Sequence, residues 1–373
     1  MITSIKLRQL AMPLVHPFTT SFGTQTVKEG ILVEMHDNEG HVGYSEIPLT
    51  SQPDYCYEDI STAWHVLGDF LIPAVLKNPE VGSTFSYTLL MEAMQPVRGH
   101  EFAKAGLEMA YWVLGAEREQ VPLSRLLGAD KTEVPVGVSI GVQEDLDTLL
   151  KRIGHFLDLG YKRIKIKIKP GWDVDVVKVV RAEYADIPLM VDANSAYSLR
   201  QIEYLKDLDP YQLMMIEQPL HYNDIIDHIK LQSELHTPIC LDESIHSVDD
   251  ARKALESAAC SVINVKVARV GGLMNARLIA ELCATKPEWH CWCGGMLESG
   301  VGRMINIALQ AIEGFDLPSD TSGSDRYFKE DLINPPVVVK DGMVSVPKGK
   351  GLGAEVLEDV VDKYTVRSQT FKP

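Results

Sequence analysis

The sequence has no basic run, no long apolar stretch and no patterned cysteines, and each absence excludes a class of protein. Lys and Arg number 36 against 52 Asp and Glu, which gives a formal net charge of −16. Such an acidic chain repels phosphate groups, so we expect neither nucleic acid nor a membrane as a partner. No apolar stretch approaches the roughly 20 residues of a membrane span. Residues 1–6 lack the apolar core of a signal peptide, which predicts a cytoplasmic protein.

The six cysteines do not form a disulfide framework in a chain of this length without a signal peptide, so we expect reduced thiols. Cys291 and Cys293 form a C-x-C motif, but no second cysteine or histidine pair stands at zinc spacing. The sequence therefore does not predict a structural zinc site.

The 373 residues suit a large domain with a smaller one. Residues 1–125 carry strand patterns followed by helical patterns, which is typical of an α+β module. Residues 30–36 and 41–45 flank turn residues and predict a hairpin. Helical patterns cover residues 57–76 and 101–116.

From Val134 the chain alternates short apolar runs with helical patterns, at intervals of about 25 residues. The runs are residues 134–140, 164–168, 189–191, 213–216, 239–241, 262–265 and 289–292. This alternation predicts a parallel sheet, and seven or eight units predict a closed α/β barrel. We assign residues 126–330 to the barrel and residues 331–373 to a segment that returns to the first module.

Three of the predicted strands lead into an acidic residue. Asp192, Glu217 and Asp242 follow them at equal intervals, since 217 − 192 = 25 and 242 − 217 = 25. One strand–helix unit separates each from the next, which places them side by side at the carboxyl-terminal rim, where barrel enzymes hold their chemistry. Three adjacent carboxylates repel one another unless a cation lies between them, and hard oxygen ligands favour Mg²⁺ or Mn²⁺. The alternative is that the acids cap helices or pair with lysines.

Lysines flank the acidic residues on both sides. Lys165 and Lys167 alternate on one strand, so they point to the same face, and Lys266 ends the strand after Asp242. A lysine acts as a base once a nearby positive charge lowers its pKa. A divalent metal can hold a carboxylate and stabilise the enediolate that forms from it, while a lysine removes the neighbouring proton. We therefore expect a small-molecule carboxylate as substrate. The alternative is that the lysines only neutralise the acids.

At this point the sequence resembles the enolase superfamily, in its muconate-lactonizing branch. More narrowly, it resembles the o-succinylbenzoate synthase / N-acylamino acid racemase family, along essentially the whole chain. The matching motifs are Lys165-Ile-Lys167, Asp192-Ala-Asn194, Glu217-Gln218-Pro219, Asp242-Glu243-Ser244, Asn264-Val-Lys266 and Gly294-Gly295-Met296-Leu-Glu298.

The resemblance implies an α+β capping domain on a modified (β/α)₇β barrel, with Mg²⁺ as cofactor and a homo-oligomeric state. Asp192, Glu217 and Asp242 would hold the metal, with Asn194, Gln218 and Glu243 behind them. Lys167 and Lys266 would be the acid/base residues, and Lys165 would lower the pKa of Lys167. Ser139, Gly295, Met296 and Glu298 are candidates for substrate binding, and residues 17–26 are a candidate for a mobile lid.

The family implies two reactions at one site. A synthase would dehydrate 2-succinyl-6-hydroxy-2,4-cyclohexadiene-1-carboxylate in menaquinone biosynthesis. A racemase would invert an N-acyl, notably N-succinyl, amino acid. Arg269, close to Lys266, favours the second reaction as well, because a guanidinium beside Lys266 would lower the pKa of that lysine. The sequence is also compatible with a muconate cycloisomerase or with a non-catalytic binding protein.

Overall fold

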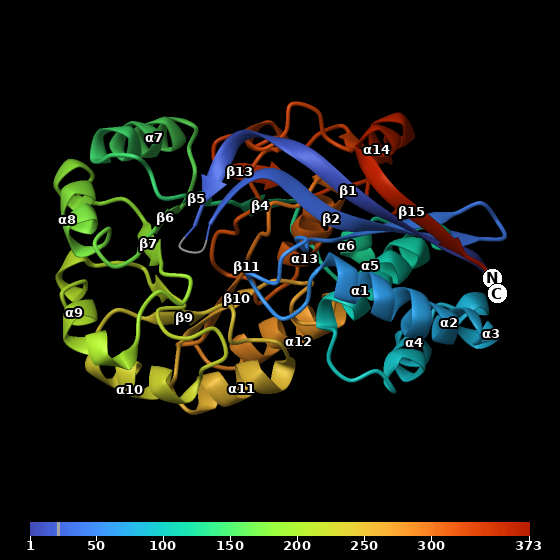
Figure 1. The fold of residues 1–373 in the computed structure, drawn as a ribbon, viewed down its shortest axis with the longest axis horizontal. Coiled ribbons are helices and arrows are strands. Elements are labelled where there is room, and N and C mark those ends of the chain that lie inside the picture. The colour runs from blue at the N-terminus through green and yellow to red at the C-terminus, as the bar shows by residue number, and fades with distance from the viewer. Residues whose placement is uncertain (21–22) are drawn as a thin grey trace.

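The computed structural model describes residues 1–20 and 23–373, which form an antiparallel module and a parallel sheet ringed by helices (Figure 1). The antiparallel sheet has the order β15-β1-β2-β3. Its strands are β1 (Ile2–Thr19), β2 (Thr24–Asp37), β3 (Val42–Ile47) and β15 (Thr365–Phe371). The predicted hairpin is confirmed, since β2 and β3 pair antiparallel.

Helices of the N-terminal module cover this sheet. They are α1 (Ile60–Val66), α2 (Ile72–Leu76), α3 (Pro79–Ser83), α4 (Tyr87–Met94), α5 (Glu101–Arg118) and α6 (Leu123–Leu126). Helix α5 lies so close to β3 that a side chain at Gly43 would meet the Ala110 carbonyl oxygen at 2.0 Å. The predicted helix 57–76 begins only at Ile60, and a π-helical turn, Leu67–Leu71, separates α1 from α2.

The parallel sheet has its seven strands in sequence order, β5 to β11. They are β5 (Val138–Ile140), β6 (Ile164–Lys167), β7 (Leu189–Asp192), β8 (Ile216–Glu217), β9 (Ile239–Leu241), β10 (Val262–Val265) and β11 (His290–Cys293). The helices between and after them are α7 (Leu146–Asp158), α8 (Val174–Glu183), α9 (Ile202–Lys206), α10 (Ile226–Glu234), α11 (Val248–Glu256), α12 (Leu273–Cys283) and α13 (Gly300–Gln310). Apart from His290, every residue of these strands is buried, which explains why most of them are apolar.

An irregular segment, rather than a regular strand, occupies the eighth position of the barrel. The Asp320 amide donates to the Cys293 carbonyl oxygen of β11, at 3.0 Å. On the other side, the Gly137 amide donates to the Ser319 carbonyl oxygen, at 2.7 Å, beside β5. Residues 319–320 therefore bridge the two outer strands of the sheet. The segment has no apolar run, which is why its position does not show in the sequence pattern.

The last part of the chain returns to the N-terminal module, and both termini lie together at one end of the molecule (Figure 1). Its elements, with the short strand that pairs with β13, are β4 (Glu133–Pro135), β12 (Ile333–Asn334), β13 (Met343–Ser345), β14 (Glu355–Val356) and α14 (Glu358–Tyr364). The predicted run 134–140 is therefore two strands, β4 and β5. The domain boundaries at 125 and 330 stay a prediction. Within the described residues, no helix is both long and apolar enough to cross a membrane.

Candidate active site

Asp192, Glu217 and Asp242 lie at the same end of three neighbouring strands. Asp192 ends β7 and stands opposite Glu217, which ends β8, while Asp242 directly follows β9. All three residues are at most 1% exposed. The structure therefore places the three acidic residues side by side at one rim of the sheet, as the equal spacing predicts, and their role as metal ligands stays a prediction.

Lys167 points from β6 toward the first of these carboxylates. Its Nζ lies 2.6 Å from Asp192 Oδ2 and donates to Asn194 Oδ1, also at 2.6 Å. The Asn194 side-chain amide in turn donates to Glu243 Oε1, at 3.0 Å. Asn194 and Glu243, which the resemblance places behind the metal ligands, therefore act here as supports for the Lys167 ammonium group.

Lys165 lies deeper, among both acidic and aromatic side chains. Its Nζ is 3.0 Å from Glu217 Oε2 and 2.7 Å from Asp320 Oδ2, and it stands 4.8 Å from the centre of the Trp292 ring. Burial by itself lowers the pKa of Lys165, but the charges of Asp320 and Glu217 outweigh burial and raise that pKa above its usual value. Lys165 is therefore held as a cation.

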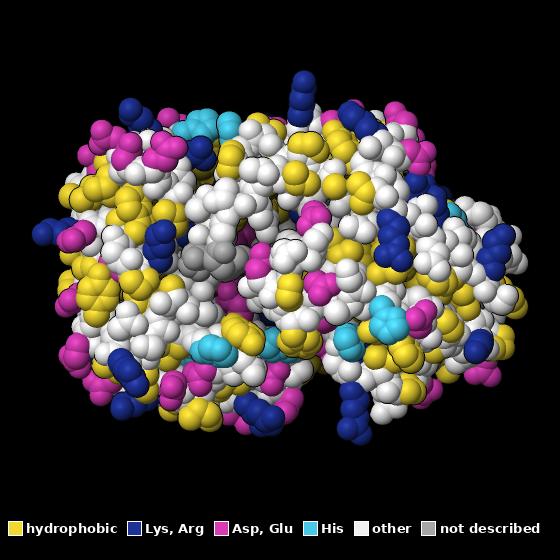
Figure 2. Space-filling view, viewed as in Figure 1, with side chains coloured by type: hydrophobic (Ala, Val, Ile, Leu, Met, Phe, Trp, Pro, Cys, Tyr) yellow, Lys and Arg dark blue, Asp and Glu magenta, His cyan; other side chains and the backbone are white. Residues whose placement is uncertain are grey.

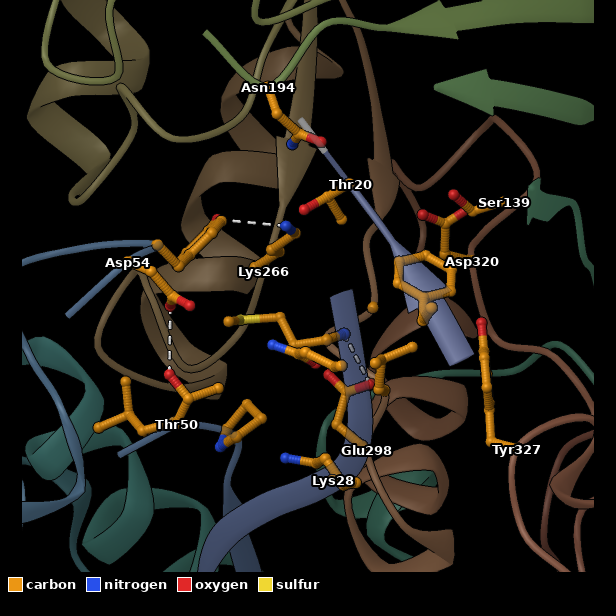
Figure 3. Close-up of a pocket in the computed structure, with 18 of the residues that line it drawn as sticks. Thr20, Lys28, Thr50, Asp54, Ser139, Asn194, Lys266, Glu298, Asp320 and Tyr327 are labelled. Carbon is orange, nitrogen blue, oxygen red and sulfur yellow. Dashed lines mark hydrogen bonds between the residues drawn. The ribbon is translucent and has the colours of Figure 1, made fainter. Parts of the chain in front are cut away.

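Lys266 approaches from the other side of the carboxylates. The strands β7, β8 and β9 separate β6 from β10, so Lys167 and Lys266 flank the acidic residues as predicted. Lys266 Nζ lies 2.9 Å from Asp242 Oδ2 and donates to the Tyr55 hydroxyl, at 3.1 Å. Figure 3 shows Asn194, the partner of Lys167, and Lys266 at one cavity.

Arg269 is fully buried, and its guanidinium contacts the Asp242 carboxylate and donates to the Tyr55 hydroxyl, at 3.0 Å. Arg269 and Lys266 therefore share the same two partners. Burial lowers the pKa of Lys266, but Asp242, Tyr55 and Glu243 raise it more, so this pKa lies well above its usual value. The predicted lowering by Arg269 is present but is outweighed, because the carboxylate of Asp242 lies beside the ammonium group.

The charges of the three carboxylates depend on one another. Burial, and then the charge of Asp192, raise the pKa of Glu217 well above its usual value. Burial also raises the pKa of Asp242, but Lys266 and Arg269 outweigh it and hold that pKa low. The site therefore disfavours the ionised form of Glu217 unless more positive charge is present.

The donor set fits a hard divalent cation, because three buried carboxylates on adjacent strands supply the oxygen ligands that such ions take. In the structure each carboxylate faces a lysine or arginine instead. Within residues 1–20 and 23–373, no three His, Cys, Asp or Glu side chains converge closely enough to hold an ion together. The expectation of a divalent cation therefore rests on the carboxylate chemistry of these residues and not on the directions in which their side chains point.

Gln218 and Asn194 build the turns after their strands. Gln218 Oε1 accepts from the Asp242 amide, at 3.0 Å, and from the Ser244 amide, at 3.3 Å. Both Gln218 and Asn194 have positive φ, 35° and 41°, in a region that ordinary side chains rarely adopt. Gln218 therefore holds the backbone at Asp242 and Ser244, and its place behind a metal ligand stays a prediction.

The candidate substrate-binding residues line one cavity of about 110 Å³ together with the three lysines. Ser139, Gly295, Met296 and Glu298 all contribute to its wall. Glu298 Oε2 accepts from the Met296 amide, at 2.8 Å, which fixes the loop after β11. Figure 2 shows the hollow near the middle of this face, with acidic side chains at its edge.

The predicted lid, residues 17–26, lies partly outside the described residues, since Ser21 and Phe22 are not described. Of the remainder, Phe18, Thr20 and Gln25 line the cavity at the tip of the β1–β2 hairpin. The hairpin therefore reaches the cavity, and its movement stays a prediction.

Sequence reasoning missed two side chains of the site, Tyr55 and Asp320, and gave no role to a third, Asn264, which belongs to the motif Asn264-Val-Lys266. Tyr55 comes from the N-terminal module and gives no local signal. Asp320 follows no apolar run. Asn264, whose side chain donates to Glu217 Oε1 at 2.7 Å, stands two residues before Lys266. Strand alternation alone would have placed Asn264 on the same face as Lys266.

Comparison with known families gives two matches that together span most of the chain. The description "Mandelate racemase / muconate lactonizing enzyme, N-terminal domain" matches residues 2–128, and "Enolase C-terminal domain-like" matches residues 149–360. The chain belongs to the enolase superfamily. The predicted resemblance and the enolase-like fold class are thereby confirmed.

Relatives within the enolase superfamily cover nearly the whole chain. It is 49% identical to a Geobacillus kaustophilus protein named o-succinylbenzoate synthase, over 99% of this chain and 97% of the relative. It is 42% identical to an Amycolatopsis protein named N-succinylamino acid racemase, over 98% of this chain and 97% of the relative. The crystal structure of an enolase superfamily member from Listeria innocua has a TM-score of 0.94 at 40% identity, covering 100% of this chain and 99% of that one. Enzymes of this superfamily generally bind a divalent metal.

Proposed function

We propose that this chain is an o-succinylbenzoate synthase that uses Mg²⁺. The observation that carries the proposal is the pair of lysines, Lys167 and Lys266, which line one cavity and flank three buried carboxylates. Relatives at 41–49% identity over nearly the full length bear that name, which supports the choice of reaction. The homo-oligomeric state and the cytoplasmic location remain predictions.

Asp192, Glu217 and Asp242 would hold the Mg²⁺. When bound, the cation supplies positive charge that offsets the negative charge on a substrate carboxylate and on the enediolate derived from it. Positive charge at this place would also favour the ionised form of Glu217, which burial and the charge of Asp192 disfavour. Asn194 and Glu243 keep Lys167 aimed at the cavity.

The reaction would remove a proton and a hydroxyl from neighbouring carbons of 2-succinyl-6-hydroxy-2,4-cyclohexadiene-1-carboxylate. Lys167 takes the proton next to the carboxylate and then donates it to the departing hydroxyl on the same face, so that water leaves and an aromatic ring forms. Lys266, held as a cation by Asp242, faces the developing negative charge from the other side. The direction of the Lys266 pKa shift suits this electrostatic role.

N-succinylamino acid racemase activity is the second candidate. Two lysines on opposite sides of one cavity allow one to remove an α-proton and the other to supply a proton to the opposite face. The 42%-identical relative with that name supports it. Exchange of the α-proton of an N-succinyl amino acid in D₂O, followed by NMR, tests this activity.

The synthase is tested by following the loss of the diene by ultraviolet absorbance, with Mg²⁺ and with EDTA. We expect turnover with Mg²⁺, little with EDTA, and a fall in kcat of about 10³-fold in Lys167→Ala, because a general base contributes about 10²–10⁴-fold. Lys162→Ala, an exposed lysine before β6, is the matched control and should keep full activity. Folded wild-type protein with Mg²⁺ but no turnover would refute the synthase.

A further inference from the structure

Arg303, in the first turn of α13, is a buried charged side chain whose terminal nitrogens have no hydrogen-bond partner among the described residues. The residue is 2% exposed. Its two terminal guanidinium nitrogens, Nη1 and Nη2, are buried and have no hydrogen-bond partner within the part of the chain that the structure describes. Its neighbours are instead two aromatic rings, with the guanidinium carbon 4.9 Å from the centre of Tyr327 and 5.4 Å from that of Phe328.

The other buried arginines show what is unusual about this one. Arg8, Arg163 and Arg269 are each at most 6% exposed, and each forms an ion pair with a carboxylate. Within the described residues, Arg303 forms no such pair. Burying a charge without a partner is costly, and aromatic faces compensate only a small part of that cost. Within the described residues, the charge of the Arg303 guanidinium is therefore left without a compensating anion.

Nearby acidic side chains are already engaged. Glu298 accepts from the Met296 amide, at 2.8 Å. Glu46 accepts from the Ser299 amide, at 2.8 Å, and lies 3.4 Å from Lys28 Nζ. Neither carboxylate forms an ion pair with Arg303, so within the described residues this cation has no acidic partner.

Arg303 lines the same cavity as the three lysines. Two hydroxyls of that cavity, Ser139 Oγ and Thr321 Oγ1, are also buried without a hydrogen-bond partner within residues 1–20 and 23–373. Figure 3 shows Tyr327, which packs on Arg303, at one side of the cavity and Lys266 at another. The wall of one cavity therefore includes the three lysines and, apart from them, an arginine whose charge the described residues leave uncompensated.

We propose that Arg303 binds the terminal carboxylate of a succinyl group while the reacting carboxylate lies at the lysines. The names o-succinylbenzoate synthase and N-succinylamino acid racemase share that succinyl group, so one such subsite serves both reactions. The guanidinium suits it, because its forked N–H groups match a carboxylate in a bidentate pair. The inference rests on the proposed function for the identity of the ligand.

The test compares two ligands that differ only in this carboxylate. Binding of o-succinylbenzoate and of 2-butanoylbenzoate, which ends in a methyl group instead, is measured by calorimetry with Mg²⁺ present. We expect wild-type protein to prefer o-succinylbenzoate by about a hundredfold, since a buried, hydrogen-bonded charge pair has an effect of that size. Arg303→Met should lose most of this preference and bind 2-butanoylbenzoate within about threefold of wild type.

Two further variants keep the test decisive. Arg303→Lys preserves the charge and should retain part of the preference. Arg277→Met, on α12 and outside the cavity, removes a partly exposed arginine paired with Glu281 and should retain all of it. Thermal unfolding of each variant without ligand shows whether it is folded. The binding preferences are compared only among folded variants.

Retention of the full preference by folded Arg303→Met would overturn the inference, as would an equal loss of affinity for both ligands, which indicates a structural role. Diene turnover by the wild type reports separately on the proposed function. If turnover is absent but Arg303 still governs the preference, the proposed function fails and the subsite stands. If turnover is normal and the preference ignores Arg303, the subsite fails and the proposed function stands.

Discussion

Lys165 and Lys167 stand two residues apart on one strand and yet have different partners. Lys167 reaches Asp192 and Asn194 beside the cavity, whereas Lys165 lies between Glu217 and Asp320. Asp320 matters at this scale because it competes with Glu217 for the same ammonium group. It also accepts from Arg163 Nη2, at 2.7 Å, and is itself buried. Asp320 is therefore a positioning residue that decides how strongly Lys165 engages Glu217.

Replacing this carboxylate is expected to weaken the metal site. In Asp320→Asn, Lys165 loses one anionic partner and pairs more strongly with Glu217, so that Glu217 becomes less available to a divalent ion. We expect the Mg²⁺ concentration for half-maximal activity to rise about 10- to 100-fold, the size of effect found for groups that support metal ligands. A Mg²⁺ titration of the initial rate measures it.

Asp325→Asn, at an exposed acidic residue in the 3₁₀ helix Ser324–Arg326, is the control and should leave the titration unchanged. Full activity of Asp320→Asn at the wild-type Mg²⁺ concentration would contradict the positioning role. A uniform fall in kcat, with no change in the Mg²⁺ dependence, would contradict it too.

At the scale of elements, α5 of the N-terminal module joins the barrel through one carboxyl group. Glu108 accepts from the amides of Leu273 and Met274, at 2.8 and 3.0 Å, and so caps the start of α12. Trp112 Nε1 also donates to it, at 2.9 Å. Burial outweighs these hydrogen bonds and raises the pKa of Glu108 from 4.5 to about 7. The contribution of this contact between α5 and α12 to the stability of the protein therefore depends on pH.

The sign of that response follows from linkage. Below pH 4.5 the carboxyl is protonated in the folded and the unfolded chain alike, and its contribution to stability is complete. As the pH rises from 4.5 through about 7, the unfolded chain releases the proton first, so this contribution is lost. Glu108→Gln cannot titrate. We therefore compare the free energy of unfolding of this variant with that of wild type. We expect the difference, variant minus wild type, to be about 2 kcal/mol larger at pH 8 than at pH 5.

Urea unfolding at the two pH values measures the difference. Glu119→Gln, at an exposed position just past α5, is the matched control. An equal stability difference between Glu108→Gln and wild type at both pH values would show that Glu108 does not titrate in this range.

At the scale of the whole molecule, the end of the chain completes the sheet that its beginning starts. Strand β15 pairs antiparallel with β1 from Ile5 opposite Phe371 to Leu10 opposite Thr365. Next to this pairing, Arg8 of β1 forms ion pairs with Glu358 and Asp362 of α14. The N-terminal sheet therefore includes residues from both ends of the sequence, with the barrel between them.

Deleting residues 365–373 should leave β1 as an open edge. An unpaired edge strand invites pairing with other chains, so we expect a lower Tm and aggregation that increases with protein concentration. Light scattering during a thermal ramp at several concentrations measures both. Deletion of residues 372–373 alone leaves β15 in place and should behave as wild type. A nine-residue deletion that keeps the wild-type Tm and does not aggregate at any of these concentrations would show that β15 does not protect the edge.

The sequence by itself determined the features that repeat locally. Strand–helix alternation predicted the parallel sheet, and the equal spacing of Asp192, Glu217 and Asp242 predicted that they would lie side by side at one rim. Alternation on a strand likewise placed Lys165 and Lys167 on one face. These features could be predicted because they depend on periodicity over a few residues, which the backbone geometry converts directly into position.

Only the tertiary structure decided which residues from distant parts of the chain share the site. Tyr55 reaches Lys266 from the N-terminal module, and Asp320 occupies the place of an eighth strand without a strand's apolar pattern. The absence of a partner for Arg303 within the described residues likewise appears only after packing. Such contacts depend on how elements dock, and docking follows the burial of whole faces, which no short window of sequence contains.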